Sequence, residues 1–562
     1  MLKPHRLFAA LGSALVLSSL LSACVGIPDS GGVRPGNEIS GQVELEDFFV
    51  FDPRGPIIDS SKENIVRDFV NAATGQSNDY STARLYLSGG LTSAWKPHEQ
   101  IYIFNSSPIV TAISDTQVKV NVSSVASVDS SGHFREQLEQ VEFLYTLAQN
   151  QDAQWRITEG PNAILLSNVF FRQLFTKHQL YFYSANFDAL VPDLRWFPAR
   201  YSRLTHIVST LLDGPSDFLS GGVLTTAFPE GTELAIDSVV TVDGVAQVDL
   251  TAQVLGASVR QRQLMLAQLN ASLAGISGVN RAQISVDRTE LAIEPIGNNI
   301  PSRNPQINSS PLVVSKGVLG YSQQDELIPM IGFTGELLSL DPLSLFYNEF
   351  LNRGAIRTAD GIWSIRGVDT PKRVFQGKTT LDPLIDLSGD IWWRESGQAG
   401  ISIFDGSDSR VIAEELTADT RIVHWAMSRD DTRLVVAIQH QGYFELLMFG
   451  VLRDAFGKAI GLHEPLQLQN QNGTALDLVW MNELSVVYAW REQGESGRVA
   501  SLEIGGLRGF LGGPVPDLVS LAAANVVRQV RVLNSSGQLF QFGTNDAWQL
   551  EVDDISLLAK LR

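Results

Sequence analysis

Cysteine is almost absent from this chain, which has one, Cys24, among 562 residues. A lone cysteine cannot form a disulfide within the chain. Nothing else in the sequence indicates a metal site, so we expect the domains to be stabilised by packing alone, as domains of this size can be.

Basic residues are also few. The chain has 42 Lys and Arg against 61 Asp and Glu, which gives a formal net charge of −19. A protein that binds nucleic acid, or adheres directly to anionic lipid, needs a surplus of positive charge. The composition therefore predicts no nucleic-acid partner.

Long apolar runs are missing beyond residue 24, where no stretch of 18 uncharged apolar residues occurs. The run from Leu7 to Leu21 has about 15 residues, against ~20 for a membrane span, and follows the basic residues Lys3 and Arg6. A basic start, a short apolar run and small residues are typical of a secretory signal. We predict that residues 1–23 are a signal peptide.

The one cysteine stands directly behind this signal. The stretch LSAC at residues 21–24 resembles the lipobox of bacterial lipoproteins. The resemblance implies cleavage before Cys24 and lipid attachment there, as an S-diacylglycerol and N-palmitoyl cysteine at the extracytoplasmic face of the plasma membrane. The alternative is an uncleaved signal anchor with an incidental cysteine. Residues 24–44, rich in Gly, Pro and Ser, are predicted to be a flexible tether.

Residues 45–167 are predicted to form the first module. Ser60 and Glu63 have the spacing of a capping box, and an apolar helical face follows. The period then changes to two in four stretches, which begin at residues 101, 118, 141 and 154. Helices before a bent antiparallel sheet resemble the NTF2-like α+β fold. His98 and His133 fall in loop-like sequence, where we expect solvated side chains.

Residues 190–294 are predicted to form a second, α+β module. A helical period runs from Leu204 to Leu212, and a second helix is expected around residues 266–276. The alternating run 234–242 predicts a strand that ends at Asp243-Gly244, a favoured hairpin turn that would pair Val242 with Val245.

This second module resembles the GerMN domain. The stretches LLDGP, FPEGTEL and VDGVAQVDLT carry the resemblance. The matching residues are Gly214, Pro215, Pro229, Glu230, Gly231, Thr232, Asp243, Gly244, Val248, Asp249 and Leu250. Glu230 and Asp249 could be an acid pair, but acids at surface turns and strand ends are usually structural, and we predict a structural role for both.

Residues 295–311, with four prolines, are predicted to be an exposed linker. Residues 312–562 then repeat an apolar strand, a tight polar turn and a second apolar strand, with SRDDTRLVVA as the best copy. This pattern predicts an all-β propeller of about five or six blades, although the repeat spacing is uneven. An all-β sandwich is the alternative.

Motifs for catalysis are missing. Gly377-Lys378-Thr379 lacks the first glycine of a phosphate-binding loop, and no G-x-S-x-G stretch occurs. We expect no enzyme activity, no cofactor and no metal. Tryptophans in the predicted blades could hold a sugar, but period-two aromatic residues more often pack within sheets. These residues are Trp363, Trp392, Trp393, Trp425, Trp480 and Trp490.

The order of lipobox, NTF2-like region, GerMN domain and propeller resembles the actinobacterial LpqB lipoprotein family. The stretch LVPDLRWFPAR at 190–200 and the SRDDTRL turn support the resemblance. It implies an accessory regulator that contacts the extracytoplasmic part of a sensor histidine kinase of the MtrA–MtrB type, with effects on cell-wall homeostasis and cell division. The alternative is an envelope protein that binds peptidoglycan or another glycan and has no kinase partner.

Overall fold

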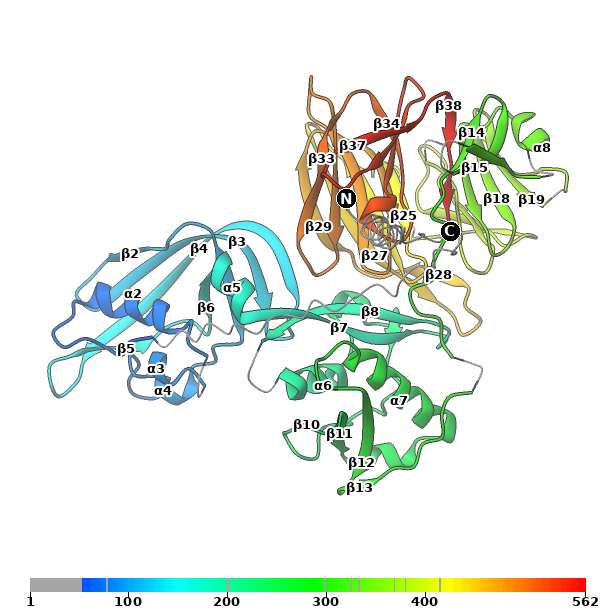
Figure 1. Cartoon of the computed structure of the whole chain (residues 1–562). Helices are drawn as coiled ribbons and strands as arrows, with labels where there is room; N and C mark the ends of the chain where they lie inside the picture. Colours follow the sequence, from blue (N-terminus) through cyan, green and yellow to red (C-terminus); the bar gives the residue numbers. More distant parts are fainter. Residues whose placement is uncertain are drawn as a thin grey trace, which may run out of the picture. The chain divides into compact units, whose positions relative to one another are not determined.

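The structure is a computed structural model and describes residues 53–76, 79–199, 203–297, 300–323, 326–331, 334–367, 369–379, 381–413 and 416–562. The predicted signal peptide, Cys24 and the tether lie outside the described residues. The described part follows the predicted order of an α+β module, a second α+β module and an all-β region (Figure 1). None of the helices in these ranges is both long and apolar enough to cross a membrane.

The first module consists of helices followed by a largely antiparallel sheet of order β5-β4-β3-β1-β6, with β2 on β3 and β1 parallel to β6. The four stretches predicted as strands are β1, β3, β4 and β5, whereas β2 and β6 were not predicted. The elements are α2 (Lys62–Ala72), α3 (Ser81–Arg84), α4 (Leu91–Ala94), β1 (Gln100–Phe104), β2 (Ile109–Ala112), β3 (Gln117–Asp129), β4 (Phe134–Gln149), β5 (Trp155–Glu159), β6 (Ile164–Ser167) and α5 (Asn168–Leu174).

Helix α2 begins one residue later than predicted. Its N-cap is Ser61, whose hydroxyl accepts a hydrogen bond from the Asn64 N–H at 3.3 Å, so Ser60 is not the cap. Glu63 still lies in the first turn, where a negative charge favours the helix dipole. A hydrogen bond from its own backbone N–H lowers the pKa of Glu63.

The second module contains two sheets, of order β8-β7-β9 and β10-β11-β12-β13. Val242 pairs with Val245 around Asp243-Gly244, as predicted. The alternating run 234–242 is a strand only in its last three residues, because Ser238 N–H closes a turn on the Ile236 carbonyl at 2.6 Å. Strand β7, before the predicted boundary, pairs with β8 from Phe175 to Tyr183.

The bounds of this module follow the chain. They are β7 (Phe175–Ser184), β8 (Leu190–Pro198), α6 (Arg203–Asp213), η1 (Asp217–Leu219), β9 (Leu224–Thr225), β10 (Val240–Val242), β11 (Val245–Leu250), η2 (Ala252–Gly256), α7 (Val259–Leu273), β12 (Arg281–Val286) and β13 (Thr289–Glu290). Both predicted helices are present as α6 and α7.

The described part of residues 312–562 forms six sheets of four or five strands, the architecture of a six-bladed propeller. The first sheet is completed from the far end of the segment, because β38 pairs with β14, and β39 pairs with β17 in the second sheet. The first two sheets, with helix α8 between them, contain β14 (Leu312–Ser315), β15 (Val318–Gln323), β16 (Glu326–Pro329) and β38 (Ile555–Leu558); α8 (Thr334–Leu338); and β17 (Ser344–Asn348), β18 (Arg353–Thr358), β19 (Gly361–Arg366), β20 (Lys372–Gln376) and β39 (Lys560–Leu561). The third and fourth sheets contain β21 (Leu384–Ile385), β22 (Ile391–Trp393), β23 (Ile401–Phe404) and β24 (Ser409–Ile412); and β25 (Ile422–Met427), β26 (Arg433–Gln439), β27 (Tyr443–Arg453), β28 (Ala459–Leu462) and β29 (Leu466–Asn472). The fifth and sixth sheets contain β30 (Thr474–Trp480), β31 (Ser485–Arg491), β32 (Gly497–Glu503) and β33 (Arg508–Val515); and β34 (Leu518–Ala522), η3 (Val527–Gln529), β35 (Arg531–Asn534), β36 (Leu539–Phe542) and β37 (Trp548–Val552).

The sheets explain why the repeat spacing in the sequence is uneven. Three of the repeats are the first hairpin of a blade, namely β21–β22, β25–β26 and β30–β31, whereas β18–β19 and β35–β36 are second hairpins. The indole N–H of Trp480 donates to the Ala426 carbonyl of the preceding blade at 3.0 Å. Five of the six predicted packing tryptophans are buried and Trp363 is half-buried, so the packing role is confirmed.

The SRDDTRL turn holds several blades together. Arg429 donates to the carbonyls of Met481 and Ala524, at 2.8 and 2.9 Å, in the two following blades. Asp431 accepts from the Leu387 N–H of the preceding blade at 2.6 Å and binds the guanidinium of Arg562. The sequence singled out this turn as a family feature, and its buried charges give it a structural reason.

The segment predicted as a linker is held from both sides where it is described. Ser302 donates to the Asp188 carbonyl of the second module and accepts from the Leu190 N–H, both at 2.8 Å. The Ile307 N–H donates to the Asn525 side chain of the propeller at 3.1 Å. One hydrophobic core also runs from the second module into the propeller. These two modules therefore share an interface rather than a free hinge.

Candidate functional site

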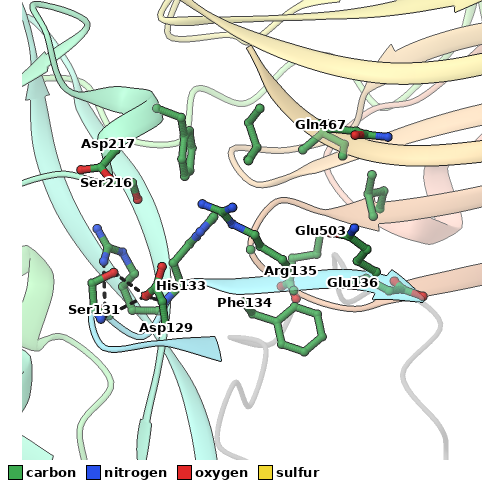
Figure 2. Close-up of a pocket in the computed structure, with 18 of the residues that line it drawn as sticks. Asp129, Ser131, His133, Phe134, Arg135, Glu136, Ser216, Asp217, Gln467 and Glu503 are labelled. Atoms are coloured by element: carbon green, nitrogen blue, oxygen red, sulfur yellow. Dashed lines mark hydrogen bonds between the residues drawn. The ribbon is translucent and has the colours of Figure 1, made fainter. Parts of the chain in front are cut away.

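A cavity of about 1090 Å³ lies where all three modules meet (Figure 2). The first module contributes the turn between β3 and β4 and the start of β4. The second contributes β8, the end of α6 and η1, and the propeller contributes β29 and the turn between β32 and β33. We call this cavity the junction pocket.

The β3–β4 turn has a fixed shape because Asp129 organises it. The Asp129 carboxylate accepts from the N–H groups of Ser131 and His133, both at 3.0 Å, and from the Ser131 hydroxyl at 2.6 Å. Gly132 has a φ of 80°, and an added Cβ would meet the Trp196 carbonyl at 2.7 Å. Only glycine therefore lets this turn approach β8, where the Trp196 N–H donates to the Gly132 carbonyl at 2.7 Å.

Strand β8 supplies a buried ion pair behind the pocket wall. Arg195 binds Asp193 through two hydrogen bonds, at 3.0 and 2.8 Å, and donates a third to the Ser131 carbonyl at 2.8 Å. Ser216 also donates to Asp193 through its N–H and its hydroxyl. Burial alone would raise the pKa of Asp193, but Arg195 and these hydrogen bonds outweigh it and hold the pKa below its ordinary value.

The propeller closes the pocket through the turn after β32. The Trp196 indole N–H donates to the Gly505 carbonyl at 2.9 Å, and Lys177 forms an ion pair with Glu503 at 2.7 Å. An added Cβ on Gly505 would meet the Leu194 carbonyl at 2.9 Å. Strand β8, Leu190–Pro198, which is most of the LVPDLRWFPAR stretch that carried only a family resemblance in the sequence, thus joins all three modules.

His133 is the main disagreement with the sequence-based expectation for this region. We expected a solvated loop histidine, but its side chain is 3% exposed and its ring lies 4.8 Å from that of Phe218. The second module covers the turn, which the local sequence could not reveal. Burial lowers the pKa of His133 to about 4, and its Nε2 atom has no hydrogen-bond partner among the described residues. His98, in contrast, is exposed as predicted, but its ring lies 5.2 Å from that of Tyr80, and partial burial lowers its pKa to about 4.

The pocket is rich in charge and mostly acidic. Six carboxylates line it, from Asp129, Glu136, Asp213, Asp217, Glu464 and Glu503, against the three guanidinium groups of Arg135, Arg195 and Arg508. Within the described residues no group of three or more His, Cys, Asp and Glu side chains could hold a metal ion. The arrangement is suited to polar recognition of a binding partner.

A second cavity, of about 270 Å³, lies among the innermost strands of the propeller. Its charges are balanced locally. Lys560 binds Asp477 at 2.5 Å, and Arg357 binds Asp382 at 3.0 Å. Burial alone would lower the pKa of Lys560, but Asp477 and Asp382 outweigh it and raise the pKa. This cluster stabilises the centre of the ring.

The residues that the sequence analysis singled out lie in different environments in the structure. Cys24 lies outside the described residues. Asp249 accepts from the Ser285 hydroxyl at 2.8 Å and from the Arg288 N–H at 3.0 Å, which confirms its structural role at the turn after β12. Glu230 is exposed. The junction pocket itself was not predicted, and only the unexplained LVPDLRW stretch pointed to it.

Three family models match the chain in the order of its modules. Residues 55–172 match the N-terminal domain of lipoprotein LpqB, residues 179–292 match a domain of sporulation and spore germination proteins, and residues 353–555 match the lipoprotein LpqB beta-propeller domain.

Individual proteins are similar over most of the chain. Lipoprotein LpqB of Bifidobacterium longum is 24% identical over 505 residues, which cover 86% of this chain and 85% of that protein. Lipoprotein LpqB of Streptomyces coelicolor is 23% identical, over 90% of this chain and 89% of that protein. Among solved structures, the first GerMN domain of the sporulation protein GerM from Bacillus subtilis aligns with a TM-score of 0.18 and 16% identity, over 22% of this chain and 97% of that one. With its modules matched in order and its relatives aligned over nearly their full length, the chain belongs to the LpqB lipoprotein family.

Proposed function

We propose that this protein is a lipid-anchored accessory regulator of a two-component sensor kinase of the MtrA–MtrB type. In this proposal a lipid on Cys24 holds the protein at the extracytoplasmic face of the plasma membrane, where it binds the extracytoplasmic domain of the kinase. The regulated processes are cell-wall homeostasis and cell division. Anchoring in the same membrane raises the effective concentration of the two partners.

The observation that carries the proposal is the junction pocket, which three interlocked modules build together. The pocket lining is polar, and hydrogen bonds between the modules fix its shape, which supports recognition of a partner. His133 does not serve as a base on a nucleophile here, because its buried Nε2 atom has no hydrogen-bond partner. Activation of a nucleophile needs a base within hydrogen-bond reach. We therefore propose that the protein is not an enzyme.

The structure favours a protein partner over a glycan. A glycan site would offer exposed aromatic faces, but five of the seven tryptophans in residues 312–562 are buried in the blades, and Trp363 and Trp548 are half-buried. The aromatic side chains that line the pocket, Phe134 and Phe218, are respectively buried and half-buried. Peptidoglycan binding is the second candidate, and the amide side chains of Gln467, Gln469 and Asn470 in the pocket wall are the feature that supports it.

The deciding experiment measures binding of the full-length protein, purified in detergent, to the purified extracytoplasmic domain of the kinase. Peptidoglycan fragments are tested in parallel. We expect saturable binding to the kinase domain and none to the fragments. Binding to peptidoglycan alone would overturn the proposed regulatory function and establish the glycan-binding alternative.

A further inference from the structure

Strand β4 has a long edge without a partner. It pairs with β3 from Phe134 to Thr146, but with β5 only from Thr146 to Gln149. Within the described residues no strand pairs with its other side between residues 134 and 145. Such an edge presents unpaired N–H and C=O groups, which are a template for an added strand.

This edge leads into the junction pocket. Glu139 pairs with Ser124 and Glu136 with Ala126, so Gln137 and Leu138 both oppose Val125 and form a bulge. A bulge turns side chains in a new direction. Here it leaves Leu138 85% exposed, in the pocket lining.

The opposite wall is a second edge strand. Strand β29 pairs only with β27 among the described residues. It alternates half-buried leucines with amide side chains, and Leu466 and Leu468 lie in the lining together with Gln467 and Gln469. The groove therefore has apolar contacts on both walls, with polar groups between them.

Charge and unsatisfied polar atoms indicate what the groove accepts. Asp213, Asp217 and Glu464 are exposed on its rim, and none of these carboxylates forms an ion pair with another described residue. Inside, Glu136 Oε2, His133 Nε2 and His463 Nδ1 are buried without a hydrogen-bond partner. Buried polar atoms are nearly always paired, so a bound segment, or water in its absence, would satisfy these three atoms. The volume, about 1090 Å³, is slightly larger than the range of small-molecule sites, which is about 300–1,000 Å³.

We propose that the junction pocket receives an extended, cationic segment of the partner protein, which adds as a strand to the free edge of β4. Main-chain hydrogen bonds to the edge supply affinity in this binding mode, and side-chain pockets supply specificity. The rim carboxylates attract Lys and Arg side chains, and Leu138 packs against an apolar one. This inference rests on the proposed function, since it assigns the kinase domain as the source of the segment.

The first test reverses the rim charges. We expect Asp217→Lys combined with Glu464→Lys to weaken binding of the kinase domain about 10-fold, mainly through slower association and with a reduced salt dependence. The control is Asp115→Lys with Asp369→Lys, which reverses two exposed acids away from the groove. Leu138→Asp is expected to weaken binding similarly. Its control is Leu550→Asp, because Leu550 is a half-exposed leucine on another edge strand, β37.

The second test reads the backbone directly and does not depend on a variant. Hydrogen exchange of the wild-type protein is measured with and without the kinase domain. Strand addition predicts that alternate amides between residues 134 and 145 gain protection, because only every second N–H points to the free edge.

The outcomes separate this inference from the proposed function. If the wild-type protein does not bind the kinase domain, the proposed function fails. If it binds, but groove variants bind as tightly as their controls or the β4 amides stay unprotected, strand addition is wrong and the regulator stands. Protection of β4 by peptidoglycan fragments instead would overturn both.

Discussion

At the scale of single residues, the protein depends on a few buried charges at the contacts between modules. Asp193 and Arg195 are 2% and 1% exposed, and their hydrogen bonds reach Ser131 in the first module and Ser216 after α6. A buried charge is tolerated only while it is paired. These residues should therefore be among the least replaceable in the molecule.

We predict that Asp193→Ala lowers the free energy of unfolding by about 3–5 kcal/mol, because it leaves the buried Arg195 guanidinium without its partner. Unfolding in urea, followed by circular dichroism, measures the loss. The control is Glu495→Ala, which removes the half-exposed pair with Arg498 and should cost about 0–1 kcal/mol. Equal losses in the two variants would contradict a special role for the buried pair.

Because His133 is buried, we predict that the free energy of unfolding decreases in mild acid. Burial lowers its pKa to about 4, whereas the unfolded chain titrates near 6.5. Below about pH 6.5 the His133 side chain binds a proton in the unfolded chain but not in the folded chain. The free energy of unfolding therefore falls until about pH 4. The charged groups around His133 have opposite effects on its pKa, since Asp193 and Asp129 raise the pKa, and Arg195 and Arg135 lower it.

The measurement compares unfolding in urea at pH 7 and pH 5. Between these values we expect the wild-type protein to lose about 2 kcal/mol more than His133→Asn does. His440→Asn replaces an exposed histidine and should follow the wild type. A pH dependence that His133→Asn leaves unchanged would place the acid sensitivity elsewhere.

At the scale of elements, the β3–β4 turn connects the first module to the second. Its Asp129 side chain fixes its shape, and Gly132 lets its backbone touch β8. The contact is made between main chains, so side-chain chemistry alone does not specify it. The contact is specified by the absence of a Cβ at position 132, which lets the two main chains approach each other.

We predict that Gly132→Ala separates this turn from β8. The new Cβ would lie 2.7 Å from the Trp196 carbonyl, so the hydrogen bond from the Trp196 N–H to the Gly132 carbonyl cannot persist. The expected result is faster hydrogen exchange of the Trp196 amide and a lower Tm. Gly89→Ala is the matched control, because Gly89 also has a positive φ, of 62°, but nothing within 4 Å of the added Cβ. An unchanged Trp196 amide in Gly132→Ala would show that the contact is dispensable.

The elements also show what the sequence could and could not predict. Period-two stretches predicted β1, β3, β4 and β5, since one face of their sheet is buried and the other is not. Strand β7 was missed because its second half is buried on both faces and shows no alternation. The pocket was out of reach, because the hydrogen bond from Trp196 to Gly505 joins residues 309 positions apart and no local pattern marks such a pair.

At the scale of the whole molecule, specific contacts join the second module to the propeller and to the segment between them. Lys177 pairs with Glu503, Tyr181 donates to Glu483 at 3.0 Å, and the guanidinium of Arg303 lies 4.6 Å from the centre of the Tyr181 ring. The first two contacts link the second module to the propeller, and the third links the second module to the segment after it. A partner held in the junction pocket would therefore touch all three modules at once.

The membrane anchor gives the prediction that belongs to this scale. If Cys24 carries the lipid, Cys24→Ser should move the protein from the membrane fraction to the soluble fraction, because acyl chains hold it at ~0.8 kcal/mol for each buried CH₂. Phase partition in a detergent that clouds on warming, with mass spectrometry of the N-terminal peptide, measures the change. A variant that stays with the membrane would support the uncleaved signal anchor instead.

The closure of the propeller ring determines when the first blade can complete its folding. Strand β14 needs β38 as its neighbour, and the hydrogen bond from Ser556 to Val314 joins residues 242 positions apart. As the chain emerges from its N-terminal side, the first blade must wait, with one edge uncovered, until nearly all of the propeller segment has emerged. Contacts between distant residues slow folding, and an uncovered edge invites aggregation. The newly made chain is therefore most vulnerable just before its last strands arrive, which makes that interval the point at which a chaperone is most useful to it.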